Sequence, residues 1–181
     1  MIDIVPYQPA WRDAFVEEAK RLRGQFGNRA LRIDHVGSTS VPGLAAKPVI
    51  DVQVSFASLE PRAALLAEMA ALGYLHVNLG AFDMVYPYFT RPAIWPSTHH
   101  VHLCVAGSLV ERNHLAFRDY LRLHPDVAAD YAQLKSALAA AHDGETLDDQ
   151  ERYSLAKSEF VTKTLAEALR FGLPTPSQSD G

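Results

Sequence analysis

The segment DHVGSTSVPGLAAKPVIDV places a glycine, a serine and an acid in an order that suits phosphate chemistry. Gly37 follows a short run of β-forming residues, and a glycine there lets backbone N–H groups approach a phosphate, while Ser38 adds a hydroxyl donor. Thr39 and Ser40 supply two further hydroxyls in the same loop. A tight turn is the alternative, because Ser and Thr side chains in turns bind their own backbone. The loop alone therefore predicts either a phosphate site or a turn.

Asp51 weighs most heavily among the partners of this loop, because it interrupts the otherwise apolar run PVIDVQV. A carboxylate in such a run costs free energy unless it is paired, hydrogen-bonded or bound to a metal ion. One explanation is an ion pair with Arg32, Lys47 or Arg91. The other is a catalytic or metal-binding carboxylate. Gln53 shares the strand face of Asp51 but adds no negative charge to hold Mg²⁺.

Two histidines in the run THHVHLC form the next candidate cluster. His100 and His102 are two residues apart and share one face of a strand, while His99 faces the other way. Two imidazoles can ligate a metal, donate to a phosphate or serve as acid and base near neutral pH. Packed histidines bonded to backbone carbonyls are the alternative. We expect His100, His102 and Asp51 to be catalytic, with Asp51 also the candidate metal ligand.

Basic side chains that can reach an anion complete the candidate site. Arg91 ends the aromatic run YPYFTR, where its guanidinium can bind a phosphate or pair with an acid. Lys135 and Lys157 lie in helical segments beside Tyr131 and Tyr153, and the alternative for such lysines is a solvated surface. The expected phosphate or nucleotide ligands are Gly37, Ser38, Thr39, Ser40, Lys47, Arg91, Lys135 and Lys157.

Helices and strands that position these residues can be read from the spacing of apolar side chains. Helices are expected at residues 10–27 and 59–73, and strands at 31–36, 49–56, 74–77, 84–91 and 99–105. The last two strands form a hairpin, and Pro87 favours a sheet edge for the first of them. Residues 110–124, 125–142 and 147–172 read as helices.

The element order predicts an α/β (α+β) fold, with a mixed sheet of about five strands, flanking helices and a C-terminal run of three helices. Residues 1–172 form one domain, and the polar residues 173–181 form a flexible tail. The strand, helix and strand between residues 49 and 77 suggest a crossover unit.

Composition restricts the partners of this domain. The chain carries 17 basic and 21 acidic residues, mixed along its length, which argues against a long nucleic acid but allows a small anionic ligand. Cys104 is the only cysteine, so no internal disulfide forms and the cytoplasm is the expected compartment. A membrane span would need about 18 uninterrupted apolar residues, and the sequence has no such run.

The segment DHVGSTSVPGLAAKPVIDV closely resembles the signature of the GrpB-like family, a group related to the nucleotidyltransferase superfamily. The resemblance continues through THHVHL, LAFRDYLRLHPDVAADYAQLK and YSLAKSEFV, and covers nearly the whole chain. It implies a nucleotidyltransferase-like sheet with the Gly-Ser loop after its first core strand. In active members of the superfamily this loop holds triphosphate, and three acids hold two Mg²⁺ ions for an in-line displacement.

Carried over by position, Gly37 and Ser38 match the loop and Asp51 matches one acid. Gln53 stands in place of the second acid, and His100 and His102 stand where the third would lie. A two-metal centre with one carboxylate is short of negative charge, so Mg²⁺ or Mn²⁺ remains only a candidate cofactor. Dephospho-CoA kinases carry similar domains, which suggests a nucleotide or coenzyme A precursor as ligand by association.

Three functions follow from these residues. The first is a nucleotidyltransferase-like protein that binds a nucleotide or another phosphate-containing small molecule, and transfers a nucleotidyl group with a metal. The second is a non-catalytic nucleotide- or coenzyme-binding module that kept the loop and lost the metal centre. The third is a transition-metal site built from His100, His102 and Asp51.

Overall fold

A computed structural model describes residues 2–92, 96–142 and 146–172. The expected tail at 173–181 lies outside the described residues. The helices and strands, in chain order with three short 3-10 helices (η), are α1 (Ala10–Phe26), η1 (Gly27–Arg29), β1 (Ala30–Val36), η2 (Ser38–Ser40), β2 (Ile50–Phe56), α2 (Arg62–Ala71), β3 (Leu75–Val77), η3 (Gly80–Met84), β4 (Tyr88–Arg91), β5 (His99–Val105), α3 (Leu109–Leu123), α4 (Pro125–Ala141), α5 (Leu147–Leu155) and α6 (Ser158–Arg170).

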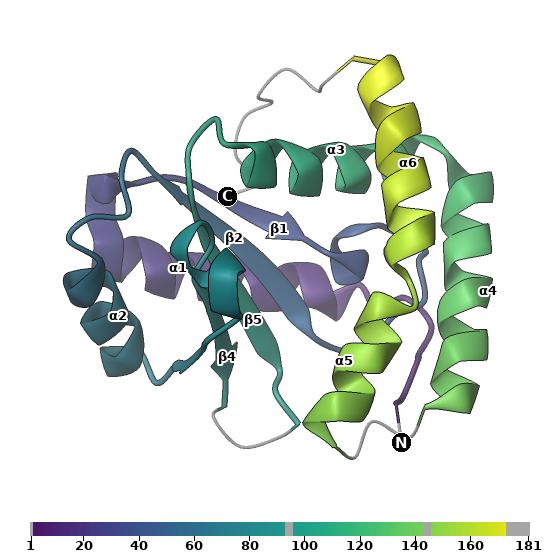
Figure 1. Cartoon of the computed structure of the whole chain (residues 1–181), viewed down its shortest axis with the longest axis horizontal. Coiled ribbons are helices and arrows are strands. Elements are labelled where there is room, and N and C mark those ends of the chain that lie inside the picture. The colour runs from purple at the N-terminus through teal and green to yellow at the C-terminus, as the bar shows by residue number, and fades with distance from the viewer. Residues whose placement is uncertain (1, 93–95, 143–145, 173–181) are drawn as a thin grey trace.

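The described strands form one mixed sheet in the order β1-β2-β5-β4-β3 (Figure 1). β2 is antiparallel to β1 and parallel to β5, and β4 is antiparallel to both of its neighbours. The predicted α/β class and five-stranded mixed sheet are confirmed. α2 connects β2 to β3 across the β4–β5 hairpin, so the predicted crossover unit is present with two strands inserted into it.

The sheet separates two environments because side chains alternate along each strand. One face carries Val52, Val54, Val101 and other apolar residues, and packs against α1 and α2 in the main core. The opposite face carries Asp51, Gln53, His100 and His102, beside α3. The polar residues singled out from the sequence are therefore on the face that the main core does not use.

The C-terminal helices pack onto the loop between β1 and β2. Val41 and Leu44 of this loop form a second apolar cluster with Leu121 of α3 and Tyr131 of α4, and Phe160 of α6 packs against it. Figure 1 shows α4, α5 and α6 gathered beside this loop. The cluster fixes the loop by contacts with residues about 80 to 120 positions away in the chain, which is long-range packing of the kind that holds a site rigid.

Two expectations about elements are wrong. β4 is not a sheet edge, because β3 pairs with it, and Pro87 precedes the strand rather than interrupting it. The C-terminal run contains four helices, since residues 147–172 form α5 and α6 with a break at Ala156 and Lys157. This break matters for the site because Lys157 lies there. Within the described residues no helix is long and apolar enough to cross a membrane.

Candidate functional site

Gly37 and Asp51 are in direct contact where β1 ends and β2 begins. Gly37 has a φ of 69°, and a Cβ placed on it would lie 2.2 Å from Oδ2 of Asp51. The register explains the contact, because Val36 of β1 is paired with Asp51 of β2. Only glycine satisfies both the positive φ and the close approach of the carboxylate. The predicted association of loop and acid in one place is therefore present.

The loop hydroxyls divide into two groups. Thr39 Oγ1 donates to the carbonyl of Val49 at 3.0 Å, and Ser40 Oγ donates to the carbonyl of Gly37 at 2.5 Å. These two side chains stabilise the turn itself, as the alternative interpretation of the sequence holds. Ser38 differs, because its side chain lies close enough to Tyr131 of α4 to influence the pKa of that phenol. Of the loop hydroxyls, Ser38 is the one directed to the C-terminal helices.

Asp51 belongs to a chain of three hydrogen-bonded side chains. His100 Nδ1 lies 3.2 Å from Asp51 Oδ1, and its Nε2 lies 2.9 Å from Oγ of Ser97. Burial alone would raise the pKa of Asp51, but the hydrogen bond to His100 and the charges of the neighbouring histidines together outweigh burial, so the pKa is lowered. The carboxylate is thus an anion at neutral pH. Its side chain is 26 % exposed while Ser97 is only 7 % exposed, so the acid end of the chain is the end that a ligand meets.

His102 and His114 are uncharged at neutral pH. Burial lowers the pKa of His102 to about 3, and burial likewise lowers the pKa of His114. The two rings lie 5.2 Å apart, and His114 Nδ1 donates to Oε1 of the fully buried Gln53 at 2.7 Å. Nδ1 of His102 and Nε2 of Gln53 are buried and have no hydrogen-bond partner among the described residues. Gln53 therefore holds a histidine from α3 in place of supplying a second acid.

Three lysines crowd together at the opposite side of Asp51. Lys47 and Lys157 both contact the ring of Tyr153, with Nζ 4.6 and 4.2 Å from its centroid. Lys135 lies over Tyr131 and donates to the carbonyl of Ala45. Burial and the charge of Lys157 lower the pKa of Lys135 to about 7, and burial and the charge of Lys47 lower that of Lys157 to about 8. Burial also lowers the pKa of Lys47. We call these three residues the lysine cluster.

A cavity of about 350 Å³, which we call the Asp51 pocket, opens between the sheet and the helices α3, α4 and α6. Its polar lining consists of Gly37, Asp51, His102, Asn113, His114 and Lys157. Its remaining wall consists of Val36, Phe117, Tyr131, Val161 and Leu165. Ligand pockets in proteins span about 300 to 1,000 Å³, so this one suits a molecule at the small end of that range.

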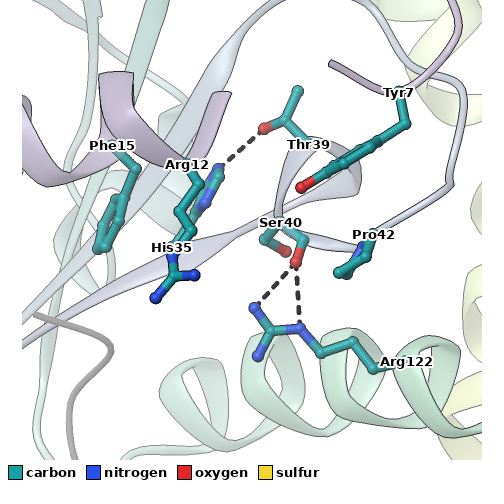
Figure 2. Close-up of a pocket in the computed structure, with 8 residues that line it drawn as sticks. All are labelled: Tyr7, Arg12, Phe15, His35, Thr39, Ser40, Pro42 and Arg122. Atoms are coloured by element: carbon teal, nitrogen blue, oxygen red, sulfur yellow. Dashed lines mark hydrogen bonds between the residues drawn. The ribbon is translucent and has the colours of Figure 1, made fainter. Parts of the chain in front are cut away.

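A second cavity, of about 210 Å³, lies on the outer side of the same loop (Figure 2). We call it the Arg122 pocket; its walls are Tyr7, Arg12, Phe15, His35, Thr39, Ser40, Pro42 and Arg122. The loop residues are shared out between the two cavities, with Gly37 in the wall of the Asp51 pocket and Thr39 and Ser40 in that of the Arg122 pocket.

Arg91 is not brought to either pocket. It forms an ion pair with Glu18 of α1, lies over the ring of Tyr74 and contacts His99. Arg91 is paired with His99 across the hairpin and so shares its face, which is the one opposite to Asp51. Glu18 is almost completely buried, and a buried carboxylate requires such partners. The ion pair with the buried Glu18 therefore explains the position of Arg91.

The ion pairs suggested for Asp51 are also absent among the described residues, where Asp51 is hydrogen-bonded to His100 instead. Arg32 instead binds Asp34, with Nη2 2.8 Å from Oδ1. Lys47 is close enough to Asp51 for their charges to interact, but no direct contact joins them. Asp51 therefore remains available to a ligand on its exposed side.

The donor set does not fit a two-metal centre. Asp51 is the one carboxylate of the Asp51 pocket, and Mg²⁺ is held by several hard oxygen ligands. Gln53 Oε1 is already occupied by His114. No group of three or more His, Cys, Asp or Glu side chains in the described ranges is arranged to hold a metal ion, which also removes the set of His100, His102 and Asp51 as a transition-metal site.

Several site residues could not be identified from the sequence. His114, Asn113 and Tyr131 come from helices whose apolar stripes gave no sign of a polar pocket wall. One signal was present: His114 belongs to the local concentration of histidines that starts at His99. Ser97 lies just before β5, and nothing in its neighbours indicates that it would bind His100.

Comparison with known proteins gives a family match over most of the chain. The family described as GrpB protein matches residues 1–167. The UPF0157 protein YqkA of Bacillus subtilis is 36% identical over 170 residues, which cover 94% of this chain and 48% of YqkA. A protein named dephospho-CoA kinase from Mycolicibacterium paratuberculosis is 32% identical over 80% of this chain and 41% of its own length. This chain thus spans about half the length of these relatives.

Solved structures extend the comparison. The crystal structure of conserved protein GrpB from Enterococcus faecalis superposes with a TM-score of 0.81 at 38% identity, covering 93% of this chain and 98% of that one. Cid1, in complex with its short product ApU, gives a TM-score of 0.51 at 13% identity, covering 77% of this chain and 44% of that one. The second likeness shows a nucleotidyltransferase-like fold and no more. The family match, the relatives and the GrpB crystal structure together establish that this chain belongs to the GrpB protein family.

Proposed function

We propose that the Asp51 pocket binds a small phosphate-containing molecule, with a mononucleotide as the best fit. The lysine cluster is the observation that carries this proposal. Burial and like-charge repulsion both disfavour the charged lysines, and they lower the pKa values of Lys135 and Lys157, burial first and the neighbouring lysine second. A phosphate brought to Lys157 would neutralise the cluster and restore ordinary lysine pKa values. Binding would relieve the destabilisation of the charged lysines, and the free energy recovered in this way would add to the affinity.

The charged and the uncharged residues of the pocket wall suit two parts of such a ligand. Lys157 and Gly37 lie in the wall where a phosphate would be held, and the glycine allows its backbone to come close. The uncharged His102 and His114 and the apolar wall suit an uncharged, flat group. A volume of about 350 Å³ favours a mononucleotide over a whole coenzyme A precursor. A link to coenzyme A metabolism rests on relatives that are named dephospho-CoA kinase and is the less direct choice.

Group transfer would depend on the carboxylate and its histidine. Asp51 orients His100 through Nδ1, an arrangement by which a carboxylate and an imidazole hold each other in one orientation. Asp51 is also the residue that would hold a Mg²⁺ or Mn²⁺ ion arriving with a nucleotide, and such an ion would polarise phosphate oxygens. A non-catalytic binding module is the second candidate. It is favoured by Gln53, which the fold uses to hold His114.

A thermal-shift panel with nucleoside triphosphates, pyrophosphate and dephospho-CoA, each with and without Mg²⁺ or Mn²⁺, tests the proposal. A ligand at 100 times its Kd should add about 2.7 kcal/mol to the free energy of unfolding. Lys157→Gln should abolish the stabilisation, whereas Lys163→Gln, an exposed lysine on α6, should leave it intact.

The role of the metal separates the two candidates. Stabilisation that needs the metal and disappears in Asp51→Asn supports transfer, and stabilisation without metal supports a binding module. If none of the ligands raises the melting temperature, or if the two lysine variants behave alike, the proposal fails.

A further inference from the structure

Lys157 is the lysine whose side chain opens into the Asp51 pocket. The lysines of the chain are Lys20, Lys47, Lys135, Lys157 and Lys163. Lys157 lies in the wall of this cavity of about 350 Å³, and the other four lysines, all of them described, do not line it. Lys135 is 3 % exposed and donates to the carbonyl of Ala45, while Lys20 and Lys163 are exposed on α1 and α6. A small molecule in the pocket therefore meets the amine of Lys157.

The surroundings of Lys157 disfavour its charged form. Among the described residues, no acid forms an ion pair with Lys157 at contact distance. Its Nζ lies 4.2 Å from the centroid of the Tyr153 ring, and Nζ of Lys47 lies 4.6 Å from the same centroid. Burial first and the charge of Lys47 second lower the pKa of Lys157 to about 8, and the charge of Asp51 offsets part of this lowering.

The neutral form of Lys157 is a nucleophile. At pH 8 about half of Lys157 is a free amine, against roughly 1 in 300 for a lysine with an ordinary pKa. A desolvated lysine beside a second cation is a setting in which lysines form imines with carbonyl compounds. Nζ attacks the carbonyl carbon, both amine protons pass to the carbonyl oxygen, and water leaves as the C=N bond forms. The reaction needs no oxidant and no reductant.

The pocket wall defines which carbonyl compound suits this amine. The apolar part of the wall, contributed by α3, α4 and α6, takes a small flat body. The charge of Lys47, which acts on Lys157, favours an anionic group on the same compound. Asp51 lies in the same wall as an anion, and its charge would balance that of a protonated imine.

We propose that Lys157 forms an imine with a small aldehyde or ketone that carries an anionic group and enters the Asp51 pocket. This activity is distinct from the nucleotide binding proposed above, because the charged lysine holds a phosphate whereas the neutral lysine attacks a carbonyl carbon. The two proposals share the cavity and depend on different forms of one side chain.

The test traps the imine in the full chain at pH 8. The probe is 4-formylbenzoate, a flat aldehyde with a carboxylate, and cyanoborohydride reduces any imine to a stable secondary amine. Peptide mapping by mass spectrometry then reports the label on each lysine as the probe concentration is raised. We expect the labelling rate of Lys157 to saturate and to exceed that of Lys20 and Lys163 at least tenfold, since those exposed lysines remain mostly protonated. The methyl ester of the probe, which lacks the negative charge, should need a roughly tenfold higher concentration to saturate the site, the loss of about one charged contact.

Lys157→Arg separates imine formation from attraction of anions, because arginine keeps the positive charge and stays protonated. This variant should lose the label at position 157, and Lys163→Arg, the matched control, should keep the label on Lys157. The measurement on the wild type decides the proposal even if Lys157→Arg does not fold. The proposal is overturned if Lys157 is labelled no faster than Lys20 and Lys163, if its labelling rate does not saturate, or if the methyl ester saturates the site at the same concentration. The thermal-shift panel contains no aldehyde, so the nucleotide proposal can fail or hold whatever this experiment gives.

Discussion

In the ligand-free protein, the buried charge of Lys135 should lower the free energy of unfolding at neutral pH. We expect the same charge to help hold the ligand. Its side chain is only 3 % exposed, and its pKa is lowered from the ordinary 10.5 to about 7, first by burial and then by Lys157. A folded-state pKa below the unfolded value means that the unfolded chain holds the proton more tightly. The penalty is therefore fully present below about pH 7 and is lost as pH rises to 10.5.

The size of the effect follows from the two pKa values. The charged lysine costs up to roughly 5 kcal/mol in the folded state below pH 7. Lys135→Met removes that cost but also removes the hydrogen bond to Ala45, which contributes about 1 to 2 kcal/mol. We expect the variant to be more stable than the wild type by roughly 3 kcal/mol at pH 6, and to lose this advantage by pH 10.

Urea denaturation at pH 6, 7.5, 9 and 10 in phosphate-free buffer measures this difference. The two proteins share all other titrating groups, so most of the remaining pH dependence cancels when one is subtracted from the other. Lys163→Met, on the exposed face of α6, should show no such pH dependence. The same Lys135→Met protein should bind the phosphate ligand more weakly. A variant that is less stable than the wild type at pH 6, or a difference that does not change with pH, would refute the reasoning.

Three further predictions concern the site and its supports. Binding of a nucleoside triphosphate should weaken as pH rises above about 8, because Lys157 loses its proton there, and calorimetry in buffers of different ionisation enthalpy should show proton uptake. Gly37→Ala should abolish binding and lower the free energy of unfolding by about 2 kcal/mol or more in urea denaturation, since its Cβ would meet Asp51 and its φ is 69°. Arg91→Met should cost about 2 kcal/mol of stability, measured in the same way, because the buried Glu18 loses one of its charged partners while it keeps Arg21 and Tyr74, and it should leave ligand affinity unchanged once the protein is folded.

The sequence predicted the sheet side of the site well. Gly37 directly follows one strand, and Asp51 lies near the start of the next. In an antiparallel pair of strands, these two positions come together. The period of two placed His100 and His102 on one face and His99 on the other. These inferences succeeded because strand alternation and short loops are local properties that residue spacing reports directly.

The helical side could not be predicted in the same way. Lys135 and Lys157 were predicted as phosphate ligands with a solvated surface as the alternative, and nothing in their spacing showed the packing of α4 and α6 onto the loop that makes them neighbours. Arg91 failed for a related reason: its face depends on the register of the hairpin, in which it is paired with His99. The residues between those two positions gave no turn signal that fixes a register, so the side of the sheet on which Arg91 lies was open until the pairing was known.

The charges around position 53 explain what a glutamine there, in place of an acid, does to phosphate binding. In a two-metal centre, acids hold cations and the cations hold phosphate, so a lost acid means a lost phosphate ligand. This pocket has one carboxylate, but the lysine cluster lies beside it. Burial lowers the pKa of each of the three lysines, and the negative charge of Asp51 partly offsets that lowering. An added acid at position 53 would lie next to two neutral histidines and Asp51, and would repel a phosphate unless metal ions compensated. Gln53→Glu should therefore weaken metal-free phosphate binding, and only added Mg²⁺ or Mn²⁺ should restore it. If Gln53→Glu binds phosphate as well as the wild type without metal, the lysines are not the groups that hold the ligand.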